Sequence, residues 1–247
     1  MTEFVLIHGG SHGAWCWSKV IDELEKLGHR GIAFDLPGHG EDFTPRETVT
    51  KDSYVEAASR FISELDSNRV VVVAHSIAGM ILPDLASSLG KKLKEIIYVA
   101  AVVLQKSQRT IDLIPEDRRP SYFEMAVLSE DNSLLLDFDK AYSLFFSDLH
   151  EEEARSLYDR LTPQPFAVYL APAREDPTSS YVPMRYILCT EDRVFPAPMC
   201  REWAGALGVP IEEIVSGHDV MLSHPRELAN VLMHLRSPKE PTHQKGS

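Results

Sequence analysis

Three residues far apart in the chain carry the side chains of a nucleophile, a base and an orienting acid. Ser76 lies in Val72-Val73-Ala74-His75-Ser76-Ile77-Ala78-Gly79, where a strongly apolar strand meets a helix. Asp192 follows a later apolar run, and His218 follows the next one. A serine activated by a histidine, which a carboxylate orients, attacks acyl carbons. The order Ser, acid, His, each after a successive strand, therefore predicts nucleophilic acyl-transfer chemistry, with Asp192 rather than Glu191 as the acid.

The turn at Ser76 departs from the usual pattern of a nucleophile elbow. That turn normally has glycine two residues before and two residues after the serine. Alanines occupy both positions, Ala74 and Ala78, and Gly79 follows one residue later. Alanine is small enough for the turn, although its Cβ makes the turn tighter. A serine that simply caps a helix is the alternative that this octapeptide alone leaves open.

Two backbone amides are candidates for an oxyanion hole, which binds the negative charge that forms on an attacked carbonyl. One belongs to Ile77, at a helix N-terminus, where the helix dipole favours negative charge. The other belongs to Gly10, in the loop that follows the first strand. A plain glycine turn is the alternative for this loop. Ser11 and His75, beside these amides, are candidate substrate contacts, and a place in the core is the alternative for His75. His12 follows the same loop and is given no chemical role.

The elements that must position these residues alternate between strand and helix. Apolar runs predict strands over 4–8, 31–34, 69–74, 95–100, 184–189 and 211–215. Helical spacing predicts helices over 14–27, 53–65, 77–89, 197–207 and 225–235, with Pro83 inside the third. This alternation predicts an α/β fold, a mostly parallel open sheet with helices on both faces.

The alternation stops in the middle of the chain, which indicates an insertion. We expect residues 1–104 and 184–236 to form one core, 105–183 an inserted, largely helical cap, and 237–247 a disordered tail.

The expected cap contains a cluster of leucine and aromatic side chains. Phe138, Tyr142 and Phe145 of this cluster are candidate substrate contacts, which favours an apolar or aromatic ester of small to medium size. Packing of the cap on the sheet is the alternative for these side chains.

Composition excludes several classes of protein. The 247 residues include 25 Lys and Arg against 37 Asp and Glu, a net charge of −12 that argues against a nucleic-acid partner. No apolar run approaches the roughly 20 residues of a membrane helix, and the N-terminus has no export signal. Cys16, Cys189 and Cys200 lack metal-ligand spacing, which predicts reduced thiols in a cytoplasmic protein and no metal site.

Taken together, these motifs resemble the α/β-hydrolase superfamily. Within it they resemble the small branch of plant methylesterases, hydroxynitrile lyases and related bacterial carboxylesterases. The resemblance rests on His8 to Trp17, Ala74 to Gly79, Cys189 to Asp192 and Gly217 to Asp219. It implies a cap, a buried pocket, no cofactor, and hydrolysis of esters through an acyl-enzyme.

Two positions differ from the hydroxynitrile lyases of this branch. Those enzymes carry Thr after the His of the first loop and Lys after the catalytic His, where this chain has Gly9 and Asp219. This difference argues against lyase chemistry. A cofactor-free dioxygenase that uses His218 and Asp192 as its base, and a ligand-binding receptor or pseudoenzyme with weak turnover, are left as alternatives. The expected partner is a small-molecule ester, with no nucleic acid and no membrane, and a homodimer is the assembly considered.

Overall fold

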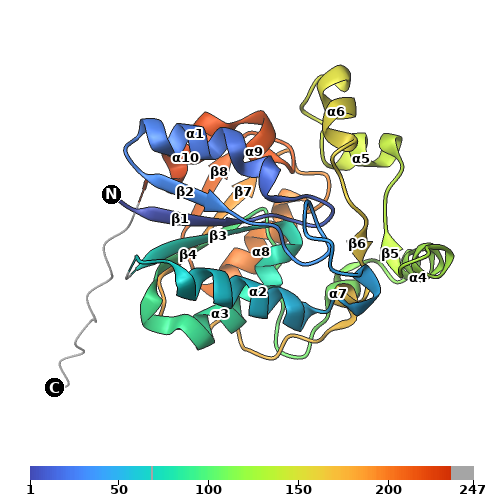
Figure 1. The fold of residues 1–247 in the computed structure, drawn as a ribbon, viewed down its shortest axis with the longest axis horizontal. Helices are drawn as coiled ribbons and strands as arrows, with labels where there is room; N and C mark the ends of the chain where they lie inside the picture. The colour runs from blue at the N-terminus through green and yellow to red at the C-terminus, as the bar shows by residue number, and fades with distance from the viewer. Residues whose placement is uncertain (68, 235–247) are drawn as a thin grey trace.

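A six-stranded, fully parallel sheet forms the centre of the molecule (Figure 1). The computed structural model describes residues 1–67 and 69–234, so the predicted tail and the core boundary at residue 236 lie outside the described residues. In sheet order the strands are β2 (Arg30–Ala33), β1 (Glu3–Ile7), β3 (Val70–His75), β4 (Leu93–Val99), β7 (Met184–Cys189) and β8 (Ile211–Ile214). The predicted α/β fold is confirmed.

Strand β3 is buried along its whole length because β1 and β4 flank it and helices cover both its faces. Its four successive valines are β-branched, which suits an extended strand buried on both sides. The chain runs from β1 outward to β2 and then returns to β3 on the other side of β1. This reversal is a topological switch point, where the loops after β1 and β3 diverge and leave room for a ligand.

Helices cover both faces of the sheet, as predicted. The helices α1 (Ser18–Lys26), α9 (Val220–Ser223) and α10 (Pro225–Leu232) bury their apolar sides on one face. The helices α2 (Lys51–Glu64), α3 (Leu82–Leu89) and α8 (Ala197–Leu207) cover the other. Short 3₁₀ helices lie at Ala14–Trp17, Arg46–Thr48 and Gly90–Lys92.

The single helix predicted over 77–89 is wrong in one respect. The structure has a 3₁₀ helix over Ser76–Ile81, and α3 begins only at Leu82. Pro83 therefore lies in the first turn of α3, where the missing N–H has no partner to lose and the fixed φ suits the helix. The prediction that Pro83 lies inside a helix and removes a backbone hydrogen bond to Gly79 is therefore wrong.

Residues 100–183 connect β4 to β7 and are named the β4–β7 segment. It contains a 3₁₀ helix (Thr110–Leu113), α4 (Arg119–Leu128), β5 (Ser133–Leu134), α5 (Phe138–Leu144), α6 (Glu151–Tyr158), β6 (Gln164–Pro165) and α7 (Ala167–Leu170). Strands β5 and β6 pair antiparallel and tie the two halves of the segment together. In Figure 1 α4, α5 and α6 lie beyond the carboxyl ends of the parallel strands.

The three cysteines are buried and free, with none in a disulfide. Across residues 1–67 and 69–234, no helix has the length and apolar character needed to cross a membrane.

Candidate active site

Ser76 occupies a strained turn between β3 and the 3₁₀ helix that follows. Its φ is 55°, in the left-handed region that costs an L-residue roughly 1–2 kcal/mol. The N–H of Val102 donates to the Ser76 carbonyl at 3.1 Å, which holds the turn from the start of the β4–β7 segment. The 3₁₀ helix receives no side-chain cap. The alternative of a helix-capping serine therefore does not fit, and the turn has the geometry of a nucleophile elbow.

Two glycines permit the close approaches that this turn requires. A Cβ on Gly79 would lie 2.3 Å from the Val102 carbonyl oxygen, a backbone atom with no room to move. A Cβ on Gly9 would lie 2.8 Å from the Cβ of Ser76. Ala74 and Ala78 are themselves fully buried. The tight contacts of the elbow thus fall at Gly9 and Gly79, which explains why alanine fits at 74 and 78.

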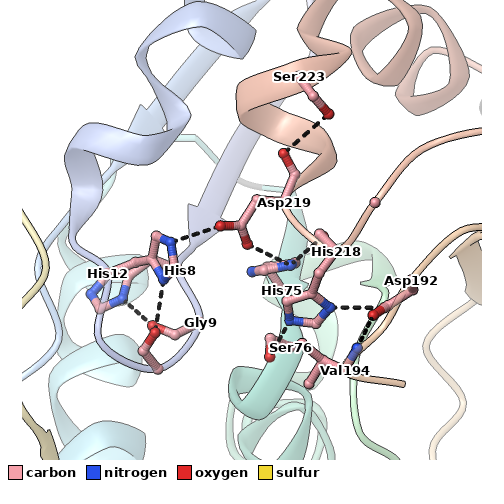
Figure 2. Close-up of polar contacts among 12 residues, drawn as sticks. His8, Gly9, His12, His75, Ser76, Asp192, Val194, His218, Asp219 and Ser223 are labelled. Atoms are coloured by element: carbon pink, nitrogen blue, oxygen red, sulfur yellow. Dashed lines mark hydrogen bonds and ion pairs between the residues drawn. The ribbon is translucent and has the colours of Figure 1, made fainter. Parts of the chain in front are cut away.

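His218 joins Ser76 to Asp192 (Figure 2). Its Nε2 lies 2.9 Å from Ser76 Oγ, and its Nδ1 lies 2.8 Å from Asp192 Oδ2. A carboxylate only accepts, so Nδ1 carries the proton and Nε2 is free to accept from the serine hydroxyl. The structure brings the three predicted residues together, from the ends of β3, β7 and β8, in the order that acyl transfer requires.

Backbone amides hold the Asp192 carboxylate in place. Its Oδ1 accepts from the N–H of Val194 at 2.7 Å and from that of Phe195 at 2.9 Å. Glu191, the neighbouring carboxylate, is exposed. Asp192 is therefore the acid that faces the imidazole, and its second oxygen is fixed by the turn that leads into α8.

The charges around His218 favour its protonated form. Burial by itself lowers the pKa of His218, because it removes the imidazolium from water. The Asp192 charge, the hydrogen bond to Asp192 and the Asp219 charge act in the opposite direction. The net result is a His218 pKa above the ordinary 6.5, which suits a group that takes a proton from serine and later returns it.

The residues of the two predicted oxyanion donors, Gly10 and Ile77, pack against each other. Gly10 is packed so closely that an added Cβ would be 3.5 Å from Ile77 Cγ2 and 2.8 Å from Gln164 Oε1. Within the described residues no intramolecular hydrogen bond uses the Gly10 N–H. Ser11 continues the loop with φ 62°, and its carbonyl accepts from Thr162 N at 2.8 Å. The loop is thus fixed from the β4–β7 segment while an amide remains for a ligand.

His75 lies behind the site rather than in it. Its side chain is fully buried, and its Nε2 donates to the backbone carbonyl of His218 at 3.0 Å. Burial lowers the pKa of His75 to about 3, so the ring is neutral. The expectation that His75 contacts substrate does not fit this position; the ring supports the backbone of the base.

The aromatic candidates of the β4–β7 segment divide into two groups. Phe145 stacks on the His218 ring, with centroids 6.0 Å apart. Phe138 and Tyr142 instead stack on each other at 5.7 Å, and this fits the packing alternative for those two rings. Phe195, which the sequence did not single out, lies edge-on to His218 at 5.5 Å. Its place three residues after Asp192 was the only signal available.

A second histidine–aspartate pair adjoins the first and was missed. His12 Nε2 lies 2.9 Å from Asp219 Oδ2, and both side chains are almost fully buried. His12 follows Gly10 by two residues, and Asp219 directly follows His218. The sequence therefore indicated this pair only in that each of its members lies close to a predicted site residue. His12 was given no chemical role from the sequence, so this contact was not expected.

His75, His218 and Asp219 have ligand atoms within 4.8 Å of one another, a spacing that a metal ion could use. However, both His218 nitrogens already face Ser76 and Asp192, and the His75 Nε2 faces a carbonyl. Among the described residues this leaves only His75 Nδ1 and Asp219 Oδ1 without a hydrogen-bond partner, and two such atoms are too few to hold a metal ion.

The sequence profile described as Alpha/beta hydrolase family matches residues 4–231. The chain belongs to this family.

Relatives of similar length share about a quarter of their residues with this chain. Carbendazim hydrolyzing esterase of Nocardioides sp. (strain SG-4G) is 28% identical over 244 residues, covering 94% of this chain and 98% of that protein. Methylesterase 18 of Arabidopsis thaliana is 26% identical over 264 residues, covering 96% and 98%.

Two solved structures share the fold over nearly the full length of each chain. An extracellular alpha/beta-hydrolase from a Paenibacillus species has a TM-score of 0.83 at 23% identity, covering 94% of this chain and 98% of that one. Polyneuridine aldehyde esterase has a TM-score of 0.80 at 25% identity, with the same coverage.

Proposed function

We propose that this protein is a serine carboxylesterase in which Ser76, His218 and Asp192 form the catalytic triad. The observation that carries the proposal is the 2.9 Å contact between Ser76 Oγ and His218 Nε2 at a strained turn. A serine held at φ 55° and aimed at an imidazole nitrogen is arranged for nucleophilic attack.

The reaction proceeds in two halves. Ser76 Oγ attacks the ester carbonyl as its proton passes to His218 Nε2, and the N–H groups of Gly10 and Ile77 bind the oxyanion. Collapse of the tetrahedral intermediate breaks the C–O bond, and His218 gives its proton to the leaving alcohol. Water, activated by His218, then attacks the acyl-enzyme, releases the acid and restores the serine. Asp192 holds the imidazole tautomer and stabilises the imidazolium throughout.

An apolar or aromatic ester of small to medium size is the proposed substrate. Phe145 and Phe195 contact His218, the group that protonates the leaving alcohol, so an apolar group near that oxygen would meet aromatic surface. We propose further that residues 105–183 act as a cap over this site. The names of the two sequence relatives, an esterase for carbendazim and a methylesterase, support ester hydrolysis.

Turnover of p-nitrophenyl esters and labelling by a fluorophosphonate test the nucleophile together. Wild-type protein should hydrolyse the esters and gain the mass of one probe, and Ser76→Ala should do neither. Full activity in Ser76→Ala would contradict the assignment. In an ester series of rising apolar size, a preference for acetate alone would contradict the proposed substrate class.

The same variant separates the alternatives. A dioxygenase that uses His218 as its base would consume oxygen with a heteroaromatic substrate and tolerate Ser76→Ala. A receptor or pseudoenzyme would bind ligand with neither turnover nor labelling. The buried, free cysteines support the proposed cytoplasmic location, where thiols stay reduced. The homodimer stays a prediction.

A further inference from the structure

Both ring nitrogens of His12 face atoms that only accept hydrogen bonds. Nδ1 lies 2.8 Å from the Gly10 carbonyl oxygen, and Nε2 lies 2.9 Å from Asp219 Oδ2. A neutral imidazole has one N–H and satisfies one such acceptor, whereas an imidazolium satisfies both. With Asp219 ionised, both contacts can be hydrogen bonds at once only if each ring nitrogen of His12 carries a proton, which would make the buried His12–Asp219 contact an ion pair.

The surroundings of Asp219 favour its ionised form. Burial raises the pKa of this carboxyl, but the charge and hydrogen bond of His12, together with His75 and His218, hold it below its ordinary value. His75 Nε2 lies 3.8 Å from Asp219 Oδ1. The Asp219 carbonyl also accepts from the N–H groups of Leu222 and Ser223, so the residue is anchored in α9.

His8 and His75, two other buried histidines of this region, have a different pattern. His8 places Nδ1 2.8 Å from the Gly9 carbonyl and accepts the Leu36 N–H at Nε2, so it needs one proton only. His75 donates from Nε2 alone, and its Nδ1 has no hydrogen-bond partner. Burial lowers the pKa of both rings, to about 4 and about 3. The double contact of His12 is thus not a general property of histidines buried here.

The pair joins the two halves of the proposed catalytic machinery. His12 contacts the carbonyl of Gly10, the residue whose N–H is the proposed oxyanion donor. His12 also contacts Asp219, which is covalently next to His218. Chain segments 207 residues apart, one carrying the donor and one carrying the base, are therefore connected by two hydrogen bonds. Figure 2 shows His12 and Asp219 on one side of His75, with the Ser76–His218–Asp192 contacts on the other.

We propose that His12 and Asp219 are positioning residues that fix the Gly10 amide relative to His218 and thereby act on turnover. This inference rests on the proposed esterase function. A buried ion pair contributes little to stability compared with apolar residues of the same size, so stability is a weak explanation for its presence. An oxyanion donor, by contrast, acts only when it is held in place before the charge develops.

Variants that break one link at a time test this role. The glutamine amide nitrogen reaches the place of Nε2, so His12→Gln keeps the Asp219 contact and loses the Gly10 contact. His12→Asn does the reverse, and Asp219→Ala removes the anchor. Each should lower kcat by about ten- to a hundred-fold, the effect of a misplacement near 1 Å, and leave KM unchanged. Asp219→Asn can donate its amide N–H to a neutral His12, keeps both contacts and should retain most of kcat.

A buried ion pair at the opposite edge of the sheet supplies the matched control. Glu95 and Arg185 form it near the amino ends of β4 and β7, with Oε1 and Nε 2.9 Å apart. Glu95→Gln removes a buried carboxylate charge, as Asp219→Asn does, but should leave kcat and KM unchanged. If Glu95→Gln lost as much kcat as His12→Gln, the loss would reflect general destabilisation of the protein. That result would overturn the proposal.

Imidazole ¹H–¹⁵N NMR supplies a readout that needs neither activity nor a folded variant. In the wild type at pH 7, His12 should carry protons on both nitrogens, and His8 and His75 on one. A His12 ring with a proton on only one nitrogen would contradict the proposed pair of hydrogen bonds. A kcat equal to that of the wild type in both Asp219→Ala and His12→Gln would contradict the positioning role. Absence of ester turnover and of Ser76 labelling in the wild type would instead remove the proposed function, which the NMR result does not test.

Discussion

His75 donates a hydrogen bond from its Nε2 to the backbone carbonyl of His218, 3.0 Å away. The residue before the proposed nucleophile thus supports the backbone of the proposed base. Its ring lies between Trp17 and His218, with centroids 6.4 Å and 4.6 Å away. Two contacts therefore join the end of β3 to the loop that carries His218. The Ser76 side chain contacts the His218 ring, and the His75 ring contacts the His218 backbone.

Loss of the His75 ring should destabilise the protein and slow turnover. His75→Ala leaves the His218 carbonyl without its donor, at about 1–3 kcal/mol for a buried group, and opens a cavity beside the base. His75→Gln, whose amide nitrogen reaches the place of Nε2, should restore much of both properties. Urea denaturation and ester kinetics measure the two effects. Equal stability of the wild type and His75→Ala would contradict this role.

The pH dependence of kcat/KM should follow His218. Its pKa lies above the ordinary 6.5, and the base must be neutral to accept the serine proton, so activity falls as pH drops through that raised value. The acidic limb of the profile should therefore lie above pH 6.5. Asp219→Asn removes one of the charges that raise this pKa and should move the limb to lower pH. A limb below 6.5 in the wild type would contradict the assignment.

The strain at Ser76 should appear as a stability difference between two inactive variants. At φ 55° glycine is unstrained and alanine is not, so Ser76→Gly should be more stable than Ser76→Ala by about 1 kcal/mol. Ser59, in the interior of α2, provides the opposite control, because glycine in a helix interior is less stable than alanine by about 1 kcal/mol. The same order at both positions would argue against a strained turn.

Stability should decline as pH falls from 6.5 towards 4. Burial lowers the pKa of His8 to about 4 and of His75 to about 3, so both stay neutral in the folded state while the unfolded chain binds protons below 6.5. The free energy of unfolding should fall by about 1.4 kcal/mol per pH unit for each such histidine. Denaturation at pH 7, 5.5 and 4.5 measures the slope.

The proposed triad could be predicted because strand ends fix it. Ser76, Asp192 and His218 each follow an apolar run, and parallel strands bring such ends to one edge of a sheet. The boundaries of β7 and α8 matched those predicted. Strand ends and helix boundaries can be predicted from the sequence because each depends on the spacing of apolar residues over a short stretch of chain.

Contacts that depend on side-chain packing could not be predicted in this way. The His12–Asp219 pair joins residues 207 apart, and no periodicity of either segment indicates it. The orientations of Phe145 and Phe138 are set by the packing of α5 on its neighbours, so their common position in an aromatic cluster did not separate them. Pro83 was misplaced for a related reason, because a 3₁₀ helix before α3 has nearly the same apolar spacing as one long helix.

The contacts of Val102 bear on how this enzyme could be re-engineered. Its N–H holds the Ser76 carbonyl, and its own carbonyl packs against Gly79, although Val102 follows the end of β4. Residues 101–104, all buried, thus belong to the scaffold of the proposed nucleophile, although they lie within the β4–β7 segment. A chimaera that exchanges the β4–β7 segment with that of a relative should be joined after Leu104, since a junction at Val99 would replace the residues that hold the serine turn.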